Sequence, residues 1–428
     1  MDSVLAQGEA AAAGLPEFNR QDLQTTGSLA KVIGFVLSDP RCLWFYGLLR
    51  NLWPIPSARG WAMVTRFDDV QEVLKHDKVF EVPFGPNVEA LNDGPNFLLG
   101  MSKGPDYDNV YRDIVAAFRR EDVAQVVAPL SHSFTVDKLA SCSGRIDAVR
   151  ELITWVPSMI SEAYYGVTIP DKYEFADWTI AMSTFMFGNP SDRPDYRRIA
   201  LAGAARLQRL IDDSIAKARL EIDGPRDDVL MRLVRQQRQG DGTPTDKVIR
   251  AYMIGMITGF VPTNTMAAGH MLEMLLRRPD FMQQARAAAI AGDDDLLRRC
   301  LFEAMRFMPL NPGPFRICVQ DYTIARGTRR AATIKAGTKL LVGTKSAMFD
   351  GRRLKRPMSF DPDRPRDNYM LFGHGLHWCV GAYIAEAQIT QTFKVLLAKR
   401  NLRRASGKTG ILQEFGPFPS GLTVEFDP

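Results

Sequence analysis

The eleven residues Leu371–Gly381 read LFGHGLHWCVG, and they place one cysteine, Cys379, among three glycines and two histidines. The chain has five cysteines at wide spacings and no C-x-x-C pair, a pattern typical of reduced thiols rather than of a disulfide framework. A zinc site would need a fourth ligand beside Cys379, His374 and His377, and the nearby sequence offers none. A buried structural thiol would need nothing special around it.

A thiolate ligand to haem iron accounts better for the residues around the cysteine. Gly373, Gly375 and Gly381 permit the tight, positive-φ backbone with which a loop approaches a flat macrocycle. A helix is expected over Val380–Lys399, so the sulfur would lie at the positive end of a helix dipole. Unpaired N–H groups there stabilise a thiolate and tune the electron density that it gives to iron. The sequence therefore predicts a haem site with Cys379 as the metal ligand.

The same stretch resembles the haem-binding signature of the cytochrome P450 family, F-x-x-G-x-[HR]-x-C-x-G. Every fixed position of the signature is matched, by Phe372, Gly375, His377, Cys379 and Gly381. The resemblance extends from about residue 60 to the end of the chain. It implies haem b (iron protoporphyrin IX) as the cofactor and a mainly α fold with a minor β part, a triangular α-rich domain with small β sheets.

Other motifs of the family follow in the expected order. Glu303 and Arg306 match E-x-x-R, and Arg364 lies in a stretch that resembles the second arginine motif, so the resemblance implies a structural triad that holds the cysteine loop. Asp108 stands where the family carries a helix histidine. The resemblance implies a set of cofactor-binding positions: Arg112, Asp108, Arg316, Phe372, Gly373, His377 and Gly381.

One long segment is almost entirely apolar. Between Arg250 and Glu273 lie 22 residues without a charged side chain, enough to cross a bilayer. Thr263, Asn264 and His270 lie inside this segment, and polar groups are costly in a membrane. We therefore expect the central helix of a large protein and no membrane span.

By the resemblance, this helix crosses the distal face of the haem. Where most members carry A/G-G-x-D/E-T, this chain has Val261 in place of the acid and Pro262 in place of the alcohol. A proline inside a helix removes a hydrogen bond and opens a kink. The candidate catalytic residues are therefore Pro262, Thr263 and Asn264. Alternatively, Pro262 only bends the helix while its polar neighbours satisfy the freed backbone groups.

The resemblance implies a monooxygenase that inserts oxygen into a lipophilic small organic substrate, with electrons from a ferredoxin or flavodoxin and its reductase. The missing acid leaves a second hypothesis open, a partner-independent hydroperoxide isomerase, dehydratase or peroxygenase assisted by Asn264. A third is a non-catalytic haem sensor, against which the apolar residues of the Glu81–Gly100 loop indicate a substrate entrance. A basic run is either a docking surface for an acidic partner or a solvated face: Arg352, Arg353, Lys355 and Arg356.

The composition is ordinary for a globular protein: 428 residues, 46% hydrophobic, 24% charged and a net charge of +5. No basic repeat indicates nucleic acid, and the start does not resemble a signal peptide, so a cytoplasmic enzyme is expected. We expect two parts, an extension with the first helices at 1–54 and one haem-binding domain at 55–428. Helices are expected at 67–76, 109–119, 122–139, 145–165, 196–220, 229–237 and 294–308. Strands are expected at 61–66, 322–324, 332–334 and 339–342, with a hairpin at 417–426.

Overall fold

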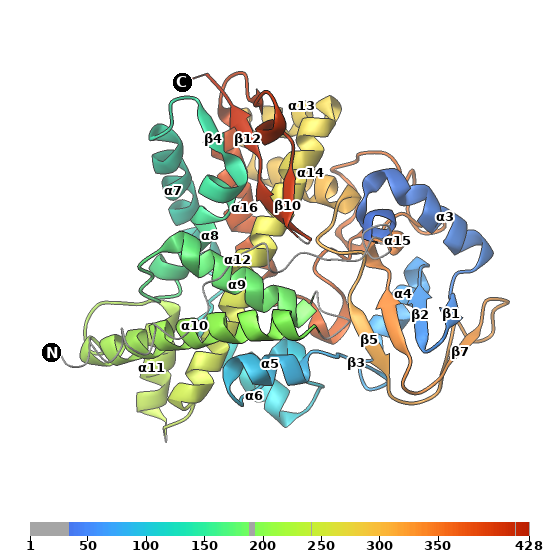
Figure 1. Ribbon diagram of the computed structural model, residues 1–428, viewed down its shortest axis with the longest axis horizontal. Coiled ribbons are helices and arrows are strands. Elements are labelled where there is room, and N and C mark those ends of the chain that lie inside the picture. Colours follow the sequence, from blue (N-terminus) through green and yellow to red (C-terminus); the bar gives the residue numbers. More distant parts are fainter. Residues whose placement is uncertain (1–33, 188–192, 241, 416, 428) are drawn as a thin grey trace.

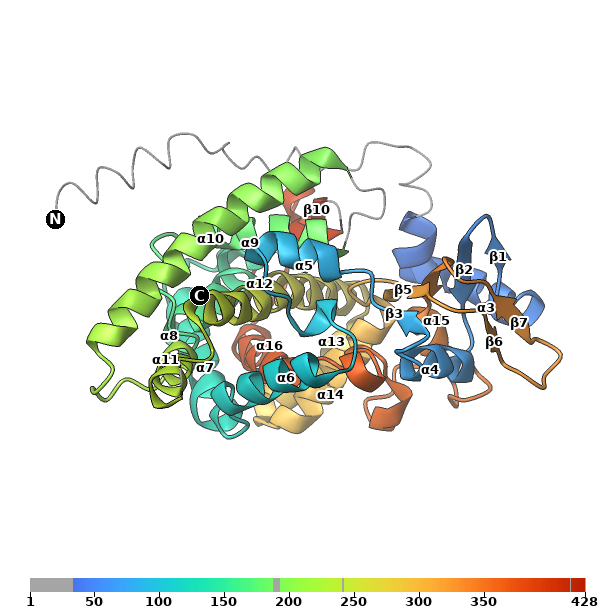
Figure 2. The same cartoon turned by 90° about the horizontal axis from the view of Figure 1, so that it is seen from below.

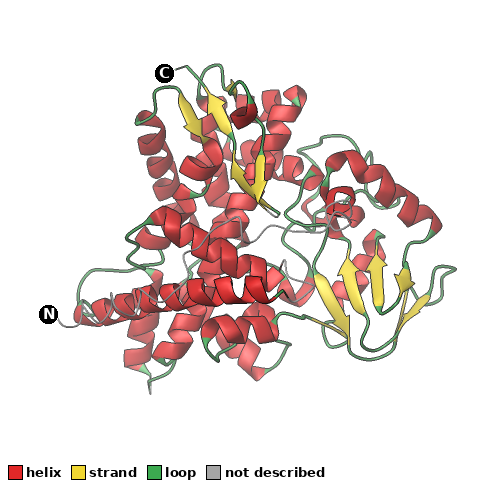
Figure 3. Ribbon diagram, in the orientation of Figure 1, coloured by secondary structure: helices red, strands yellow, loops and turns green. Residues whose placement is uncertain are grey.

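The computed structural model describes residues 34–187, 193–240, 242–415 and 417–427. Helices form most of this part of the chain, and short strands gather into small sheets at its margins (Figures 1 and 3). The predicted mainly α fold with a minor β part is confirmed.

The central element is α12 (Asp246–Arg277), a helix of 32 residues that is buried on nearly every side. It packs against α9 (Lys172–Phe187) and α10 (Pro194–Leu220) on one side, and against α14 (Asp294–Phe307) and α16 (Ala382–Ala398) on the other (Figure 2). A helix surrounded by others has to be apolar all round, which explains the uncharged segment. Within the described ranges, no helix is long and apolar enough to cross a membrane.

The other helices cover this layer or lie beside the sheet. Two of them, η4 and η5, are short π-helical segments that lead into α7 and α8. Their bounds are α3 (Leu43–Leu52), α4 (Phe67–Lys75), α5 (Gly85–Asn92), α6 (Pro105–Ala117), η4 (Val123–Val127), α7 (Ala128–Ala140), η5 (Ala148–Ile153), α8 (Trp155–Ala163), α11 (Val229–Gln239), α13 (Pro279–Ala291) and α15 (Thr344–Ala347). Short 3-10 turns complete the set at Pro40–Cys42, Leu98–Gly100, Arg366–Asn368, Gly375–His377 and Lys408–Gly410.

The largest sheet lies at one side of the molecule, with α3, α4 and α15 beside it (Figure 1). Its strand order is β1-β2-β8-β5-β3, and only the central pair β2 and β8 is parallel, with Trp61 opposite Lys339. The five strands are β1 (Ser57–Ala58), β2 (Trp61–Val64), β3 (Phe80–Glu81), β5 (Phe315–Cys318) and β8 (Lys339–Val342).

The remaining strands form a three-stranded sheet, β4-β12-β9, and two hairpins. The prediction of a hairpin at 417–426 is wrong, because its two strands do not pair with each other. Strand β11 pairs with the preceding strand β10, and β12 pairs with β4 and β9. The bounds are β4 (Arg145–Asp147), β6 (Tyr322–Ile324), β7 (Ala332–Ile334), β9 (Arg403–Arg404), β10 (Gln413–Phe415), β11 (Phe418–Gly421) and β12 (Thr423–Glu425).

Three further expectations are corrected by the structure. The segment Glu81–Gly100, expected to be a loop, contains α5 and a 3-10 turn. The helix expected at 145–165 begins as strand β4, because its first residues pair with β12. Helices α9 and α13 were not anticipated, since α9 is buried on most sides and shows no amphipathic period.

Candidate haem site

The cysteine loop is held by its own backbone just before α16. The Cys379 N–H donates to the Phe372 carbonyl at 2.9 Å, and the Ala382 N–H donates to the Cys379 carbonyl at 3.2 Å. The helix begins at Ala382 rather than at the predicted Val380, with Gly381 as its N-cap. The sulfur therefore sits at the N-terminal end of a 17-residue helix, as its sequence position indicated.

Two glycines of this loop have the backbone conformation that only glycine adopts easily. Gly373 has φ 79° and Gly375 has φ 71°. A Cβ on Gly375 would lie 2.6 Å from the Leu74 carbonyl oxygen at the end of α4. The glycine at 375 is therefore required by close packing against α4. A Cβ on Gly381 would make only an ordinary contact, 3.9 Å from the Cys379 sulfur.

The Cys379 side chain is accessible although protein surrounds it. The residue is exposed, yet burial of the sulfur raises the pKa of its thiol. A hydrogen bond from the Gly381 backbone N–H lowers this pKa, but by less. Burial, with smaller contributions from Tyr164 and Cys379, raises the pKa of the fully enclosed Tyr165. A sulfur that is both accessible and desolvated borders a space inside the protein. A cation bound to the sulfur would overcome this raised pKa, because a metal-bound thiol is deprotonated.

One face of α12 also borders open space inside the protein. We call its residues Gly259 and Thr263, four positions apart, the open stripe. Gly259 is exposed in the middle of α12, and a Cβ added there would meet nothing within 4 Å. One turn earlier, a Cβ on Gly255 would lie 2.4 Å from the ring of Phe97, which is 7% exposed. One turn later comes the half-buried Thr263. These positions share one face of the helix, so α12 presents Gly259 and Thr263 to open space beside Phe97.

The backbone around Pro262 carries unusual polar groups. The helix continues through the proline, which has no N–H, so the Thr258 carbonyl lacks its normal donor. The Thr258 hydroxyl is buried and has no hydrogen-bond partner among the described residues. The Thr263 hydroxyl donates to the carbonyl of Gly259, with a second contact of 3.3 Å to that of Phe260. A threonine often bonds in this way to a carbonyl one turn back in its own helix, and here the bond does not reach the carbonyl of Thr258 that Pro262 leaves free.

Asn264 is directed away from the open stripe of α12. Its amide donates to Gln388 Oε1 at 2.8 Å, and Gln388 donates to Thr392 at 2.9 Å, all three groups being buried between α12 and α16. Of the three candidate catalytic residues, only Thr263 is thus on the open stripe with a polar side chain. The partner Gln388 was not anticipated, because it lies 124 residues further along the chain.

A buried cation and a neutral imidazole lie together near the cysteine loop. Arg316 on β5 is 5% exposed, and its guanidinium donates only to the Phe315 carbonyl at 2.8 Å; among the described residues no carboxylate lies within ion-pair distance. Burial lowers the pKa of Arg316 to about 10. Burial and the neighbouring charge of Arg316 lower the pKa of His377 to about 4. Asp77 acts on Arg316 only from beyond ion-pair distance. A buried guanidinium without a direct ion-pair partner calls for an anionic ligand, and a haem propionate is such a group.

Two further predicted cofactor-binding positions lie on α6 and are exposed. Arg112 donates to Asn109, and Asp108 pairs with Lys103, so no contact ties either residue to Arg316 or His377. A residue of the same helix does contact the loop: the hydroxyl of Tyr107 donates to the Leu376 carbonyl at 3.0 Å, and its ring lies edge-on to His377 at 6.1 Å. Tyr107 was missed, although as a buried position in an amphipathic helix its pattern alone indicated an inward contact.

The structure brings the predicted triad together in a buried network. Arg306 donates two hydrogen bonds to Glu303, at 2.9 and 2.7 Å, and Arg364 lies 3.5 Å from the same carboxylate. The hydroxyl of Tyr369 donates to Glu303 at 2.6 Å, a fourth member that was not anticipated. The arginines also bind the carbonyls of the segment before the cysteine loop, Met348, Lys355, Pro357 and Ser359. The network thus fixes the chain that leads to Cys379.

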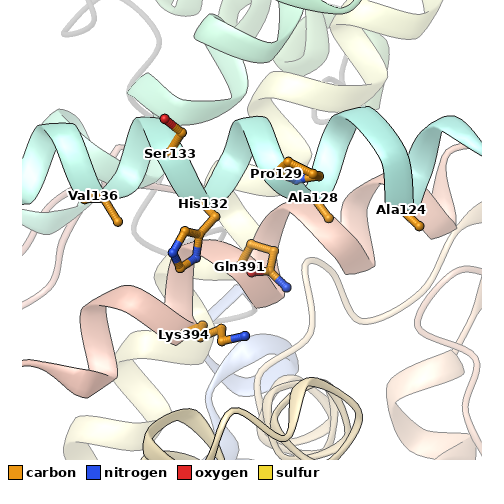
Figure 4. Close-up of a pocket in the computed structure, with 8 residues that line it drawn as sticks. All are labelled: Ala124, Ala128, Pro129, His132, Ser133, Val136, Gln391 and Lys394. Atoms are coloured by element: carbon orange, nitrogen blue, oxygen red, sulfur yellow. The ribbon is translucent and has the colours of Figure 1, made fainter.

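A separate groove lies on the surface between α7 and α16, with a volume of about 590 Å³ (Figure 4). It is lined by apolar residues of α7 together with His132, Gln391 and Lys394. None of the predicted site residues lines it, so it is distinct from the space beside Cys379.

Comparison with known proteins gives one consistent result. The cytochrome P450 family model matches residues 178–413, which is more than half of the chain. The mycinamicin IV hydroxylase/epoxidase of Micromonospora griseorubida is 26% identical over 372 residues, covering 83% of this chain and 87% of that protein. The vitamin D(3) 25-hydroxylase of Pseudonocardia autotrophica is 26% identical over 344 residues, covering 78% and 79%.

Solved structures share the fold at lower identity. The P450 heme domain of Tepidiphilus thermophilus superposes with a TM-score of 0.76 at 20% identity, covering 96% of this chain and 97% of that one. The crystal structure of CalO2 gives a TM-score of 0.76 at 21% identity, covering 92% and 97%.

The fold and these matches define the class of protein, a haem-dependent oxidoreductase of the monooxygenase type, as the sequence predicted. The chain belongs to the cytochrome P450 family.

Proposed function

We propose that the sulfur of Cys379 ligates the iron of haem b, and that the macrocycle lies between the cysteine loop and the open stripe of α12. The observation that carries this proposal is the accessibility of Cys379 and Gly259, two positions that protein otherwise surrounds. Leu376 and Val380 of the loop pack against the apolar cluster that contains Phe260 of α12. The haem, when bound, supplies the oxidising chemistry, and the chain supplies position and protons.

Arg316 and His377 are the proposed partners of the haem carboxylates. The lowered pKa of His377 keeps its imidazole neutral near pH 7, so it acts as a hydrogen-bond donor rather than as a second cation. Arg316 supplies the charge, and it is held on the rigid strand β5. Arg112 remains a proposed contributor from α6, where Tyr107 already joins that helix to the loop. Asp108, which stands at the position of the family's histidine, is an acid paired with Lys103 and would repel a haem carboxylate.

The proposed substrate is a lipophilic small organic molecule held against the open stripe. Phe84, Leu91 and Phe97 belong to the apolar cluster that includes Phe260 of α12, and Phe97 covers Gly255 directly. An apolar wall with few polar groups favours an apolar ligand. The names of the relatives, a hydroxylase/epoxidase and a 25-hydroxylase, support oxygen insertion as the reaction.

Thr263 is the proposed distal polar residue. Its hydroxyl lies on the open stripe and is oriented by the Gly259 carbonyl, so it can hold or pass a proton on that face. The peroxygenase and isomerase alternative rests on the missing acid at Val261, and the amide of Asn264, its proposed assisting residue, pairs instead with Gln388 between α12 and α16. Electrons are proposed to come from a ferredoxin or flavodoxin with its reductase.

The haem-binding domain is proposed to span 55–428. The segment before it is docked on this domain by Arg50 of α3, which donates to the Ser346 carbonyl at 2.8 Å.

Two measurements test this function on the purified protein supplied with haem. The difference spectrum of the reduced protein with carbon monoxide must show the red-shifted absorption band of a thiolate ligand. Oxidation of lipophilic compounds must require a reductase chain and dioxygen. A spectrum of imidazole ligation would refute the ligand, and turnover with a hydroperoxide alone would instead support the alternative reaction.

A further inference from the structure

Helix α3 exposes an unusual apolar face. Trp44, Leu48 and Leu52, spaced four residues apart, are 66%, 49% and 76% exposed, and Trp53 directly after the helix is 56% exposed. The opposite face is buried in the protein through residues that include Tyr46. We call Trp44, Leu48, Leu52 and Trp53 the α3 face. Figure 1 shows α3 at the outer edge of the molecule, beside the five-stranded sheet.

This concentration is not the usual scatter of single exposed side chains. Fifteen large hydrophobic side chains are exposed in the described part of the chain, and five of them, the α3 face together with Phe35, fall within 35–53. Contiguous exposed apolar surface marks an interaction site.

A basic run borders the α3 face. Arg352 donates to the side-chain amide oxygen of Asn51, which lies on the exposed side of α3. Three more exposed cations follow Arg352 in the sequence. The basic run is Arg352, Arg353, Lys355 and Arg356.

Two acidic groups near α3, Asp39 and Asp350, are largely buried. Asp39 and Asp350 keep only 12% and 3% of their side chains exposed, and they already pair with Arg41 and Arg352. Arg353, Lys355 and Arg356 are exposed, and none of them makes an ion pair within the described part of the chain.

We propose that the α3 face and the basic run together dock this protein on the surface of an anionic phospholipid bilayer. Tryptophan is enriched at membrane–water interfaces, because its ring is apolar at one end and polar at the other. An amphipathic helix lies in the plane of the interface with its apolar face among the acyl chains. Lysine and arginine beside it interact with anionic headgroups. The chain carries the first two elements on and directly after α3, and the third in the segment that Arg352 joins to Asn51 of α3.

Charge argues against the other occupants of this face. A second copy in a two-fold symmetric contact would bring the same patch of each molecule together, and so two basic runs close to each other. An acidic electron carrier matches the basic run, but weak electron-transfer contacts are small and leave no role for two exposed tryptophans and two leucines. A bilayer with anionic headgroups matches both parts of the surface.

The experiment is flotation of the full-length, haem-loaded protein with phospholipid vesicles. Vesicles of phosphatidylcholine mixed with phosphatidylglycerol are expected to carry the protein, and vesicles of phosphatidylcholine alone to carry much less. Leu52→Asp is expected to lower the partition coefficient by about tenfold or more, because it removes one buried leucine and adds a charge. Leu220→Asp is the matched control, since Leu220 is 89% exposed on α10 and is expected to leave the partition unchanged.

The electrostatic part has its own pair of variants. Arg353→Glu with Lys355→Glu is expected to abolish the preference for anionic vesicles, and added salt is expected to weaken binding. The control is Arg209→Glu with Lys217→Glu, which changes the net charge equally on the exposed side of α10. Equal binding by Leu52→Asp and the unmodified chain would overturn the proposal. So would variants that alter only self-association in sedimentation, or only the rate of reduction by an acidic carrier.

Discussion

The two sides of the proposed haem site are built in opposite ways. On the cysteine side, the Glu303 carboxylate receives donors from Arg306 and Tyr369 and lies close to Arg364, and these arginines hold the carbonyls of the segment that leads to Cys379. On the α12 side, Thr258 keeps a hydroxyl without a partner. The first region is held by a dense buried network in which only the Arg364 Nε lacks a hydrogen bond among the described residues, whereas in the second region the hydroxyl of Thr258 lacks a partner and its carbonyl lacks its normal donor. A rigid network suits a permanent ligand, and open groups suit a changing one.

The largest effect is expected at the proposed iron ligand. Cys379→Ala should remove the thiolate band from the carbon monoxide difference spectrum and abolish oxidation of substrate, because no other described side chain replaces the sulfur. Cys142→Ser is the control, since Cys142 lies just after α7 and its thiol donates to the Lys138 carbonyl of that helix. A normal spectrum from Cys379→Ala would end the assignment.

The triad is expected to show the next largest effect, on stability. Glu303→Gln leaves Arg306 and Arg364 buried without a charge partner, and loss of one member of a buried pair costs roughly 3–5 kcal/mol. The free energy of unfolding from denaturant titration checks this. Asp363→Asn breaks an ion pair with Arg299 whose aspartate is 84% exposed, and it should leave the unfolding midpoint unchanged. Equal stability of the two variants would show that the network is not what fixes the cysteine side.

The same contrast explains how far the sequence led. Glu303 and Arg306 are neighbours on one helix turn, and the cysteine loop is a contiguous pattern, so local spacing sufficed to place them. The strands β6, β7 and β8 were predicted with their observed bounds, because each is a short apolar run between turns. On the α12 side, the direction of Asn264 depends on Gln388, and no local rule gives a partner so distant in sequence.

Local sequence patterns also failed to predict helices that lack an amphipathic period. Both faces of α9 are buried, by α10 on one side and by α12 on the other, so its apolar residues show no period of 3.6. Helix α5 starts at Gly85-Pro86 in a segment rich in turn formers, and tertiary packing of Val88 and Leu91 outweighs those local preferences.

A pH effect is expected on the α12 side and is smaller than the loss of the triad. Burial lowers the pKa of His270 to about 4, with Lys345 and Arg277 adding to the effect, while carbonyls of Met308 and Pro309 oppose it. The unfolded chain binds a proton near pH 6.5, so the stability from the neutral imidazole is fully present above that pH. It is lost as pH falls from about 6.5 to 4, by about 3 kcal/mol at most.

Denaturant titrations between pH 7.5 and pH 4 measure this dependence. His270→Gln should lower the free energy of unfolding at neutral pH, because packing is lost. The free energy of unfolding of this variant should then fall less between pH 7.5 and pH 4 than that of the unmodified chain. A variant that keeps the full acid dependence would show that other groups cause it.

The smallest effect separates the two polar neighbours of Pro262. Thr263→Val removes the hydroxyl from the open stripe while keeping the side chain's shape, and should lower the fraction of electrons that appear in product, because the proposed proton-transferring group is gone. Asn264→Ala should leave that fraction near its normal value and lower the unfolding midpoint instead, because it leaves Gln388 without its buried donor. Gln388→Ala serves as the matched control for Asn264, since it breaks the same hydrogen bond from α16.

The opposite result would be a loss of coupling between electrons and product in Asn264→Ala but not in Thr263→Val. Asn264, which is directed at α16, would then be the residue that serves the chemistry. The open stripe of α12 would then be no guide to how protons reach the site.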